Sequence, residues 1–326
     1  MKEYVTRKIK SKRKCKFTYS YTDMSGKKAS KRSVKLAVKD IYVPPAYDNV
    51  RINLNKKEKV LAIGSDEKGR SQYVYNAKFT EKQSKTKYKK MIDFGESYNK
   101  IMNQVKRDLY AEGDTKDKQI AMALILVVDC GIRIGSEKYR DENKSFGATT
   151  LESRHIKVSG STVSVDFIGK KGIQNTGKSR SKRLSRNLRI KKRSTRANEP
   201  VFSYSRGSKW HTLKSTDVNK YLKKFGNFSS KNFRTWVANL SFITELLKRH
   251  VPNKCKTDKQ KKDIITESVK VCADKLNNTP SVCKSNYIDP YIIKFYLEDT
   301  KRFIEAFRGS KTKDEISERY IKLLKH

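Results

Sequence analysis

Four residues of the chain are of types that together could carry out a reaction at a phosphodiester. A tyrosine can attack phosphorus, two arginines can hold the non-bridging oxygens, and a lysine can protonate the departing 5′ oxygen. Such a set performs transesterification without a metal ion. The residues are Arg133 in GIRIGSEKY, Lys170 in FIGKKG, Arg234 in SSKNFRTW and Tyr287 in NNTPSVCKSNY.

Each of these residues also has an ordinary structural explanation. Arg133 stands among apolar residues and glycines, so its guanidinium needs a partner, either a phosphate or the carboxylate of a buried ion pair. Arg234 falls in the first turns of a predicted helix, where backbone N–H groups favour an anion. A single tyrosine such as Tyr287 usually packs, because a phenol with a pKa of about 10 is mostly neutral in water near neutral pH.

The charge of the chain points to a polyanionic partner. There are 76 Lys+Arg against 34 Asp+Glu, a net charge of +42. Surfaces with this excess repel themselves unless a polyanion such as a nucleic acid neutralises them. The charge alone does not identify a reaction, because a non-enzymatic DNA-packaging protein would carry it as well.

The composition also argues against several classes of protein. The five cysteines are odd in number and form no CxxC pair, which disfavours a disulfide framework or a zinc site. The longest apolar run, residues 120–128, is too short to cross a bilayer. The sequence has no HExxH, no GxxxxGK[ST] and no carboxylate cluster suited to two metals. We therefore expect no metal site, no cofactor and no membrane insertion.

The elements that position these residues divide into an N-terminal and a C-terminal part. Residues 1–76 contain short alternating segments between glycines and prolines, which predict a β-rich domain. Residues 77–90 are polar and basic, and we interpret them as a hinge linker. Residues 91–326 should form a mainly α-helical domain with a small embedded sheet, so the fold class is α+β. The strands expected in the first domain are 16–21, 33–38, 59–63 and 72–75.

In the second domain, helical spacing of apolar residues is the main signal. Apolar residues recur every three or four positions from Met91 to Leu109, the spacing of one helical face. A hairpin is expected from 155–158 and 162–168, with a third strand at 183–190. Between Lys170 and Arg196 every charged residue is basic, and we expect this segment to close onto DNA. The further expected helices are 116–130, 217–225, 230–249, 258–276, 291–307 and 313–324.

The segment GSDEKGRSQYVY, residues 64–75, could read a DNA groove. Its glycines permit a tight turn, and strand alternation would place Tyr73 on one face and Gln72 on the other, beside Arg70. An ordinary hairpin with strand tyrosines, Tyr73 and Tyr75, explains the same pattern. The segment alone does not decide between them.

Taken in order, GSDEKGRSQYVY, GIRIGSEKY, FIGKKG, KNFRTW and NTPSVCKSNY closely resemble the poxvirus-type DNA topoisomerases of type IB. The resemblance covers about residue 60 to the C-terminus. It implies a two-domain clamp around duplex DNA, with a β-rich N-terminal domain and a helical catalytic domain shared with tyrosine recombinases. It also implies relaxation of supercoiled DNA through transient single-strand cleavage, strand rotation and religation, without ATP or metal.

The resemblance assigns roles to single residues. Tyr287 would form a 3′-phosphotyrosyl bond, Arg133 and Arg234 would bind the scissile phosphate, and Lys170 would be the general acid, assisted by Arg133. Lys231 falls where the family also has a lysine. The residues implied to contact DNA are Arg70, Gln72, Tyr73, Tyr75, Lys138, Tyr139 and Lys231.

Two positions depart from the poxvirus pattern. Asn278 stands where those enzymes have a histidine, and an amide can donate a hydrogen bond to phosphate but cannot carry a charge or move a proton. We expect it to stabilise the transition state more weakly. Ser136 replaces a basic residue, so a strict cleavage-site preference is not carried over.

Two rival functions remain open at this point, a tyrosine recombinase or integrase and a non-enzymatic DNA-packaging protein. The β-rich start and GSDEKGR argue against a recombinase, which usually has a helical N-terminal domain and a second pocket histidine. We expect a monomer acting on duplex DNA. If the protein is viral, its place would be the virion and the cytoplasmic viral factory, and otherwise the nucleus or nucleoid.

Overall fold

The computed structural model describes residues 3–13, 16–67, 69–251 and 257–325. The chain divides into two compact units, Met1–Tyr88 and Lys89–His326. Cys15 and Cys255, two of the five cysteines, lie outside the described residues, whereas Cys130, Cys272 and Cys283 are buried thiols. Among the described residues, no helix is long and apolar enough to span a membrane.

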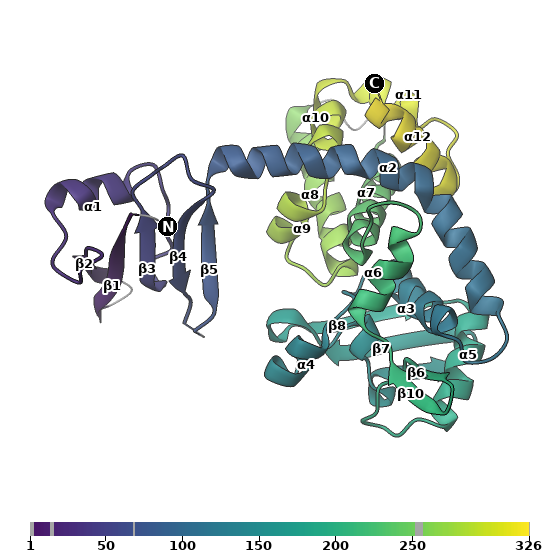
Figure 1. Ribbon diagram of the computed structural model, residues 1–326. Helices are drawn as coiled ribbons and strands as arrows, with labels where there is room; N and C mark the ends of the chain where they lie inside the picture. The colour runs from purple at the N-terminus through teal and green to yellow at the C-terminus, as the bar shows by residue number, and fades with distance from the viewer. Residues whose placement is uncertain (1–2, 14–15, 68, 252–256, 326) are drawn as a thin grey trace. The chain divides into compact units, whose positions relative to one another are not determined.

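The first unit is built on an antiparallel sheet with strand order β2-β1-β3-β4-β5 (Figure 1). Its core contains Val5, Val50, Ile52 and Ala62, and along β3 the buried Val50 and Ile52 alternate with exposed residues. This β-rich unit was expected. The elements are β1 (Tyr4–Arg13), β2 (Lys16–Thr22), α1 (Lys31–Val38), β3 (Asp48–Asn53), β4 (Val60–Ser65) and β5 (Ser71–Tyr75).

The strand predicted at 33–38 is wrong, because this segment is helix α1. The Ser30 side chain accepts a hydrogen bond from the backbone N–H of Ser33 and so caps the helix. Ala37 is the residue that α1 buries against the sheet core. The alternation of apolar residues thus indicated a strand where a capped helix formed. Separately, strands β1 and β3 were not predicted.

Residues 77–90 are helical and belong to α2 (Ala77–Tyr110), which contains the boundary between the two units. Asn76 begins the helix, because its side chain accepts from the backbone N–H of Lys78 and its carbonyl from that of Thr80. Further along, α2 buries an apolar face at the predicted helical spacing, including Phe94, Ile101 and Val105. The polar composition of 77–90 therefore reflects an exposed helix, and its bending as a hinge stays a prediction.

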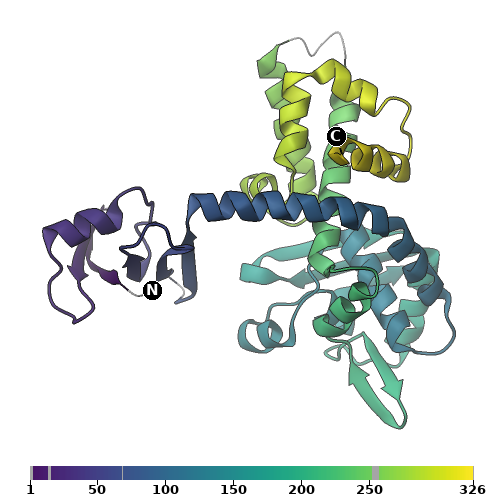
Figure 2. The same ribbon diagram turned by 45° about the horizontal axis from the view of Figure 1, so that its top comes forward.

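The second unit contains most of the helices and two small sheets. The predicted hairpin is confirmed as β6 paired antiparallel with β7, and the sheet order is β6-β7-β8. Figure 2 shows the hairpin of β9 and β10 projecting from the rest of this unit. Its strands are β6 (Ile156–Ser159), β7 (Thr162–Ile168), β8 (Gln174–Ser179), β9 (Ser203–Arg206) and β10 (Lys209–Thr212).

The helices of the second unit surround an aromatic core. Phe94 and Phe233 have ring centroids 5.0 Å apart, and Trp236 stacks on Tyr320 at 5.2 Å. Besides three short 3-10 turns, the helices are α3 (Lys116–Cys130), α4 (Glu137–Asn143), α5 (Lys182–Arg193), α6 (Ser215–Lys223), α7 (Ser230–Arg249), α8 (Asp258–Lys275), α9 (Pro280–Asn286), α10 (Pro290–Glu298), α11 (Thr300–Ala306) and α12 (Lys313–Lys325).

Two predictions about this unit are wrong. The third strand is β8, and residues 183–190 lie in helix α5, where Ser181 caps the N-terminus and Leu184 and Leu188 form a buried face. The helix expected at 291–307 is two helices. Asp299 has non-helical dihedrals, φ −139° and ψ 73°, that end α10, and its carboxylate accepts from the backbone N–H of Arg302 to begin α11.

Candidate active site

The segment that carries Arg133 follows an abrupt helix end. Helix α3 is buried on nearly all sides and stops at Gly131, which has φ of +63° and packs against the carbonyl group of Lys275 so closely that a side chain would not fit. The extended chain that follows is pinned by two backbone hydrogen bonds, from Ala148 to the Arg133 carbonyl at 2.8 Å and from Thr149 to the Ile134 carbonyl at 2.7 Å. Arg133 is thereby held half-buried on a fixed backbone.

Arg234 lies in the second turn of α7 and is 4% exposed. Its guanidinium donates to the carbonyl of Gly131 and, at 3.0 Å, to the carbonyl of Leu276. These residues cap the C-termini of α3 and α8, the ends that carry partial negative charge. The buried cation is therefore stabilised by two helix ends.

Tyr287 ends the short helix α9, which begins with Thr279 as its cap and Pro280 in its first turn. The buried amide of Asn239 fixes the backbone here, because it donates to the Tyr287 carbonyl at 2.9 Å and accepts from the Asp289 N–H at 2.7 Å. The Arg234 guanidinium carbon lies 5.3 Å from the centre of the Tyr287 ring. The tyrosine and the arginine are thus held against each other.

The surroundings of Tyr287 favour its ionised form. Burial, the largest single influence, would raise the pKa of this phenol, but the charges of Arg234 and Arg133 and the polar contacts of Arg234 and Asn278 together lower it by more, so the net pKa is below the ordinary value of 10.0. A lower pKa increases the fraction of phenolate at a given pH. A phenolate is the form that attacks phosphorus readily.

Asn278 connects Arg133 to this group. Its side-chain oxygen accepts from Arg133 at 3.0 Å, so the partner of Arg133 is an amide and not the carboxylate of a buried ion pair. The Asn278 amide nitrogen and the Arg234 Nε are buried and close to Tyr287, yet neither makes a well-oriented hydrogen bond to another described residue. Buried donors without acceptors are costly, and a phosphate oxygen would satisfy them.

Lys170 and Lys231 reach the same pocket from two other elements. Lys170 lies in the turn between β7 and β8, and Lys231 in the first turn of α7. The pocket has a volume of about 620 Å³ and is lined by five cationic side chains, with no carboxylate among its described lining residues. The cations are Arg133, Lys170, Lys171, Lys231 and Arg234, and Asn278 and Tyr287 line the pocket with them.

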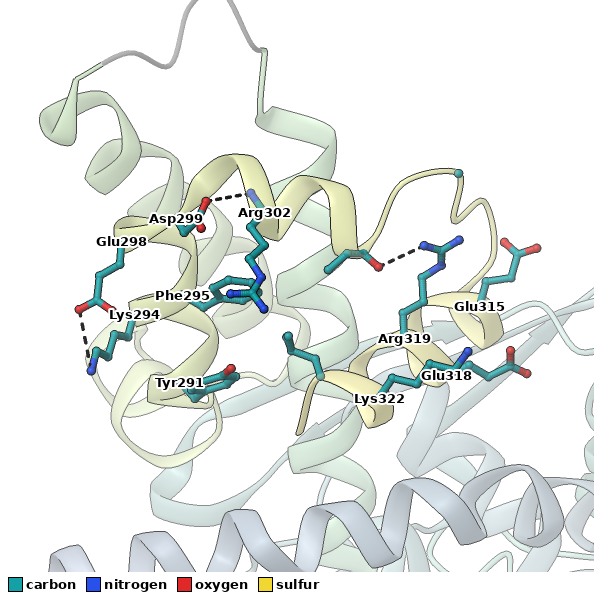
Figure 3. A pocket seen from close by; sticks show the side chains of 13 residues that line it. Tyr291, Lys294, Phe295, Glu298, Asp299, Arg302, Glu315, Glu318, Arg319 and Lys322 are labelled. Atoms are coloured by element: carbon teal, nitrogen blue, oxygen red, sulfur yellow. Dashed lines mark hydrogen bonds and ion pairs between the residues drawn. The ribbon is translucent and has the colours of Figure 1, made fainter. Parts of the chain in front are cut away.

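A larger pocket lies between α10, α11 and α12 and contains the next tyrosine, Tyr291 (Figure 3). Two of its basic side chains already have partners. Lys294 pairs with Glu298 at 3.9 Å, and Arg319 donates to the Ala306 carbonyl at 3.1 Å. Four carboxylates line this pocket and would repel a phosphate, so we do not assign the chemistry to it. They are Glu298, Asp299, Glu315 and Glu318.

The residues predicted to contact DNA in the first unit lie around β5. Tyr73 and Tyr75 point outward from the sheet, with rings stacked at 6.2 Å and exposed fractions of 53% and 45%. Gln72 lies on the other face, as the alternation predicted, and donates to Asp66 at 2.9 Å. Arg70 is held by the same carboxylate, with Nη2 at 2.7 Å.

The other predicted DNA contacts, Lys138 and Tyr139, are exposed on α4 of the second unit. Lys138 faces Glu142 at 3.9 Å, and Tyr139 is 55% exposed. Ser136 precedes this helix as its N-cap residue but makes no capping hydrogen bond. The side chains of Lys138 and Tyr139 are therefore accessible to a ligand at the surface.

The basic segment 170–196 consists of the β7–β8 turn, β8 and α5, and not all of its lysines face solvent. Lys191 is buried and bonded to Asp114 and to the carbonyl of Ser203, while Lys192 donates to the carbonyls of Ser153 and Ile156. These two lysines support the fold. Arg186 and Arg189 on α5 are exposed.

Sequence reasoning missed two residues that organise this site, Asn239 and Asn277. Asn239 lies inside α7 on its buried face, where an amide is unusual and signals a hydrogen-bond network. Asn277 follows the end of α8 with φ of +50°. Its position after a helix could be recognised, but its partner in β8, 101 residues away, could not.

The comparison with protein families agrees with this geometry. Residues 76–311 match the family described as eukaryotic DNA topoisomerase I, catalytic core. This range contains Tyr287 and every cation that lines its pocket. The chain belongs to the type IB DNA topoisomerases, enzymes that act on DNA.

Individual relatives support the same assignment. The chain is 30% identical over 304 residues to DNA topoisomerase 1B of Acanthamoeba polyphaga mimivirus, covering 89% of this chain and 87% of the relative. It is 23% identical over 253 residues to DNA topoisomerase 1B of Vaccinia virus (strain Western Reserve), covering 76% and 75%. With DNA topoisomerase 1 of Schizosaccharomyces pombe it shares 28% over 200 residues, 60% of this chain and 22% of the relative. These matches disfavour the recombinase and packaging alternatives.

Proposed function

We propose that Tyr287 is the nucleophile of the topoisomerase reaction and that Arg133, Arg234 and Asn278 bind the scissile phosphate. One observation carries this assignment. The Tyr287 ring lies against Arg234 in a pocket lined by five cations and no carboxylate among the described residues. A phosphodiester placed there meets complementary charge on its non-bridging oxygens and an activated phenol at its phosphorus.

The cleavage step conserves atoms and charge. The Tyr287 oxygen forms a bond to phosphorus while its proton leaves to solvent, and the bond from phosphorus to the 5′ oxygen breaks. Lys170 gives a proton to that oxygen, which departs as a 5′-hydroxyl. The product is a 3′-phosphotyrosyl bond, and the free 5′ end rotates before the reverse reaction reseals the strand. The energy of the broken phosphodiester is kept in the tyrosyl bond, so the cycle consumes no ATP.

The two arginines have different tasks. Arg234 is held by two carbonyls and lies under Tyr287, so it stabilises charge at the tyrosine and at one phosphate oxygen. Arg133 is less buried, and a phosphate oxygen can replace the Asn278 oxygen as the acceptor of its hydrogen bond. Arg133 can therefore stay bound to the phosphate during the reaction and assist Lys170. Asn278 donates its free N–H to a phosphate oxygen without moving a proton.

Contacts outside the pocket provide affinity and register. The stacked Tyr73 and Tyr75, with Arg70 and Gln72, are proposed to contact DNA from the first unit, and Lys138 and Tyr139 from the second. Lys231 would add a DNA contact from within the pocket. The two units together would clamp a duplex, and the segment 170–196 would close onto it. A single chain supplies every residue in this scheme, which is consistent with action as a monomer.

The place of action follows from the kind of organism that encodes the protein. Among the relatives are proteins of mimivirus and vaccinia virus. If this chain is viral, it acts in the virion and the cytoplasmic viral factory, and otherwise in the nucleus or nucleoid.

Two isosteric substitutions test the assignment. Tyr287→Phe removes the attacking oxygen and keeps the ring, so relaxation of supercoiled plasmid and covalent capture of DNA in SDS should both be lost while binding is retained. Tyr291→Phe is the matched control four residues later and should leave relaxation unchanged, because Tyr291 lines the other pocket. The wild-type protein should relax plasmid in EDTA and without ATP.

Three results would contradict the proposal. Normal relaxation by Tyr287→Phe would exclude Tyr287 as the nucleophile. Peptide mapping that places the DNA adduct on another tyrosine would do the same. A strict requirement for Mg²⁺ would show that a metal, and not the cations of the pocket, carries the phosphate charge.

A further inference from the structure

Three consecutive residues after helix α8 each hold a different part of the active site. The Leu276 carbonyl accepts from Arg234 at 3.0 Å, and the Asn278 side-chain oxygen accepts from Arg133 at 3.0 Å. Between them, the side chain of Asn277 binds strand β8. We call residues 276–278 the connecting turn. It is followed directly by α9, which ends at Tyr287.

The contact made by Asn277 is a paired hydrogen bond to the main chain. Its Oδ1 accepts from the Thr176 N–H at 3.1 Å, and its Nδ2 donates to the Thr176 carbonyl at 3.3 Å. Strand β8 is the edge of the β6-β7-β8 sheet, so the groups of Thr176 that face away from β7 have no neighbouring strand. The amide of Asn277 takes the place of that strand, because it presents a donor and an acceptor in one plane.

The backbone of Asn277 is suited to this contact. Its φ of +50° lies in the left-handed region, which asparagine enters more easily than most residues. A glycine would adopt the same backbone without supplying the amide. The asparagine thus combines the helix-ending conformation with a bond to β8.

Strand β8 transmits this contact to Lys170. Asn175, next to Thr176, is buried, and its Nδ2 donates to the Ile173 carbonyl at 2.8 Å. The same carbonyl accepts from the Gly169 N–H at 2.8 Å, which closes the β7–β8 turn. The Asn175 side chain also packs directly on Gly169, where any side chain would collide with it. Lys170 follows Gly169 directly. The contacts from Asn277 to Thr176 and from Asn175 to the β7–β8 turn therefore fix the position of the Lys170 backbone.

We infer that Asn277 is a positioning residue that sets Lys170 at the correct distance from Tyr287. This inference rests on the proposed role of Lys170 as the proton donor to the 5′ oxygen. Lys170 comes from a sheet, whereas Tyr287 and the phosphate-binding residues come from helix ends. The pair of bonds between Asn277 and Thr176 joins these two bodies beside the pocket. Proton transfer requires the donor within hydrogen-bond reach, so a loose turn would slow the reaction.

The test uses two leaving groups at a cleavage site first mapped on this enzyme. One duplex has the natural 5′ oxygen at the scissile bond, and the other has sulfur in its place. A thiol has a pKa of about 8.5 and leaves as a thiolate, so it does not need a proton from Lys170. Single-turnover cleavage of both duplexes is measured with saturating full-length enzyme.

The variants isolate the amide. Asn277→Gly keeps the left-handed backbone and removes both bonds to Thr176, and Asn277→Asp keeps the acceptor and loses the donor. Asn49→Gly is the matched control, since Asn49 has a φ of +48° in the first unit. We expect Asn277→Gly to slow cleavage of the oxygen duplex ~10- to 100-fold and of the sulfur duplex less than ~3-fold. Asn277→Asp should fall between, and Asn49→Gly should cleave both duplexes at the wild-type rate.

Failure of the inference about Asn277 can be told apart from failure of the proposed role of Lys170. Equal slowing of Asn277→Gly on both duplexes, or no slowing on either, overturns the inference. Lys170→Ala is run in parallel, and sulfur should restore its cleavage. If sulfur does not, the proton-donor role of Lys170 is wrong, and hydrogen exchange then tests the contact itself. Faster exchange of the Thr176 amide in Asn277→Gly supports the structural link to the turn, while unchanged protection refutes it.

Discussion

Gly131 provides a test of the way in which the fold holds the two arginines. An alanine at this position would take a left-handed backbone, with φ of +63°, which costs about 1 kcal/mol. Its Cβ would also lie 3.1 Å from the Lys275 carbonyl carbon and within 3.0 Å of the oxygen. Relief of this overlap costs about 1 to 3 kcal/mol more, as overpacking of a close backbone approach does. Gly131→Ala should therefore lower the free energy of unfolding by about 2 to 4 kcal/mol.

The same overlap should reduce catalysis. Ordinary contact begins near 3.4 Å, so the Lys275 carbonyl has to retreat by about 1 Å. Lys275 leads directly into the connecting turn, which binds Arg234 and Arg133. A displacement of this size at reacting groups costs on the order of 100-fold in rate. We expect that loss in single-turnover cleavage under conditions where the variant is fully folded.

Gly113→Ala is the control for backbone strain. Gly113 has φ of +67°, almost the same as Gly131, but no atom lies within 4 Å of the position of its Cβ. This variant should lose about 1 kcal/mol of stability and no cleavage rate. Urea unfolding and single-turnover cleavage are measured on both proteins. If the two variants lose equal stability and cleave equally fast, the close packing of Gly131 on α8 does not position the arginines.

Two further predictions concern the charge around Tyr287. In the protein without DNA, the pKa of Tyr287 should lie below 10.0 because Arg234 and Arg133 stabilise the phenolate. The ¹³Cζ signal of labelled tyrosine measures this pKa, and Tyr287→Phe assigns the signal. Arg133→Gln should raise the pKa of Tyr287 and so reduce the phenolate fraction at a given pH. Arg186→Gln, at an exposed site on α5, should leave the pKa unchanged. Equal shifts in the two variants would contradict stabilisation of the phenolate by the nearby Arg133. Asn278→His should speed single-turnover cleavage up to ~10-fold, because a ring can move a proton and an amide cannot. Unchanged or slower cleavage would show that the amide is not the weaker residue.

Helices with one apolar face were predictable because the burial pattern is local. The prediction for 230–249 is confirmed, and the buried Phe233, Trp236 and Leu240 recur at the spacing of one helical face, although α7 also buries the residues between them. The hairpin of β6 and β7 was predictable for a similar reason, since the turn at Gly160 adopts the left-handed backbone that glycine permits.

The errors arose where a short capping interaction decided between structures. The segment 33–38 alternates like a strand, but the Ser30 cap and the burial of Ala37 favour a helix. In 291–307 the apolar spacing continues through Asp299, whose side chain nevertheless starts a new helix. Hydrophobic period alone does not contain this information.

The members of the site were predictable one by one, but their contacts were not. Motif resemblance identified Arg133, Arg234, Lys170 and Tyr287, and the structure brings them to one pocket. The bond between Arg133 and Asn278 joins residues 145 positions apart, and no local pattern specifies it. The same holds for Asn277 and Asn239, whose functions depend on which main-chain groups the fold leaves beside them.

The way in which Arg234 is stabilised has a direct consequence for the chemistry. A buried guanidinium costs several kcal/mol unless its charge is compensated, and a carboxylate is the usual partner. A carboxylate beside Arg234 would repel the phosphate and raise the pKa of Tyr287. The fold instead uses the carbonyls of Gly131 and Leu276 at two helix C-termini, each equivalent to about half a negative charge. These dipoles stabilise the cation and leave its remaining N–H groups and its positive potential available to the phosphate and to the Tyr287 phenolate.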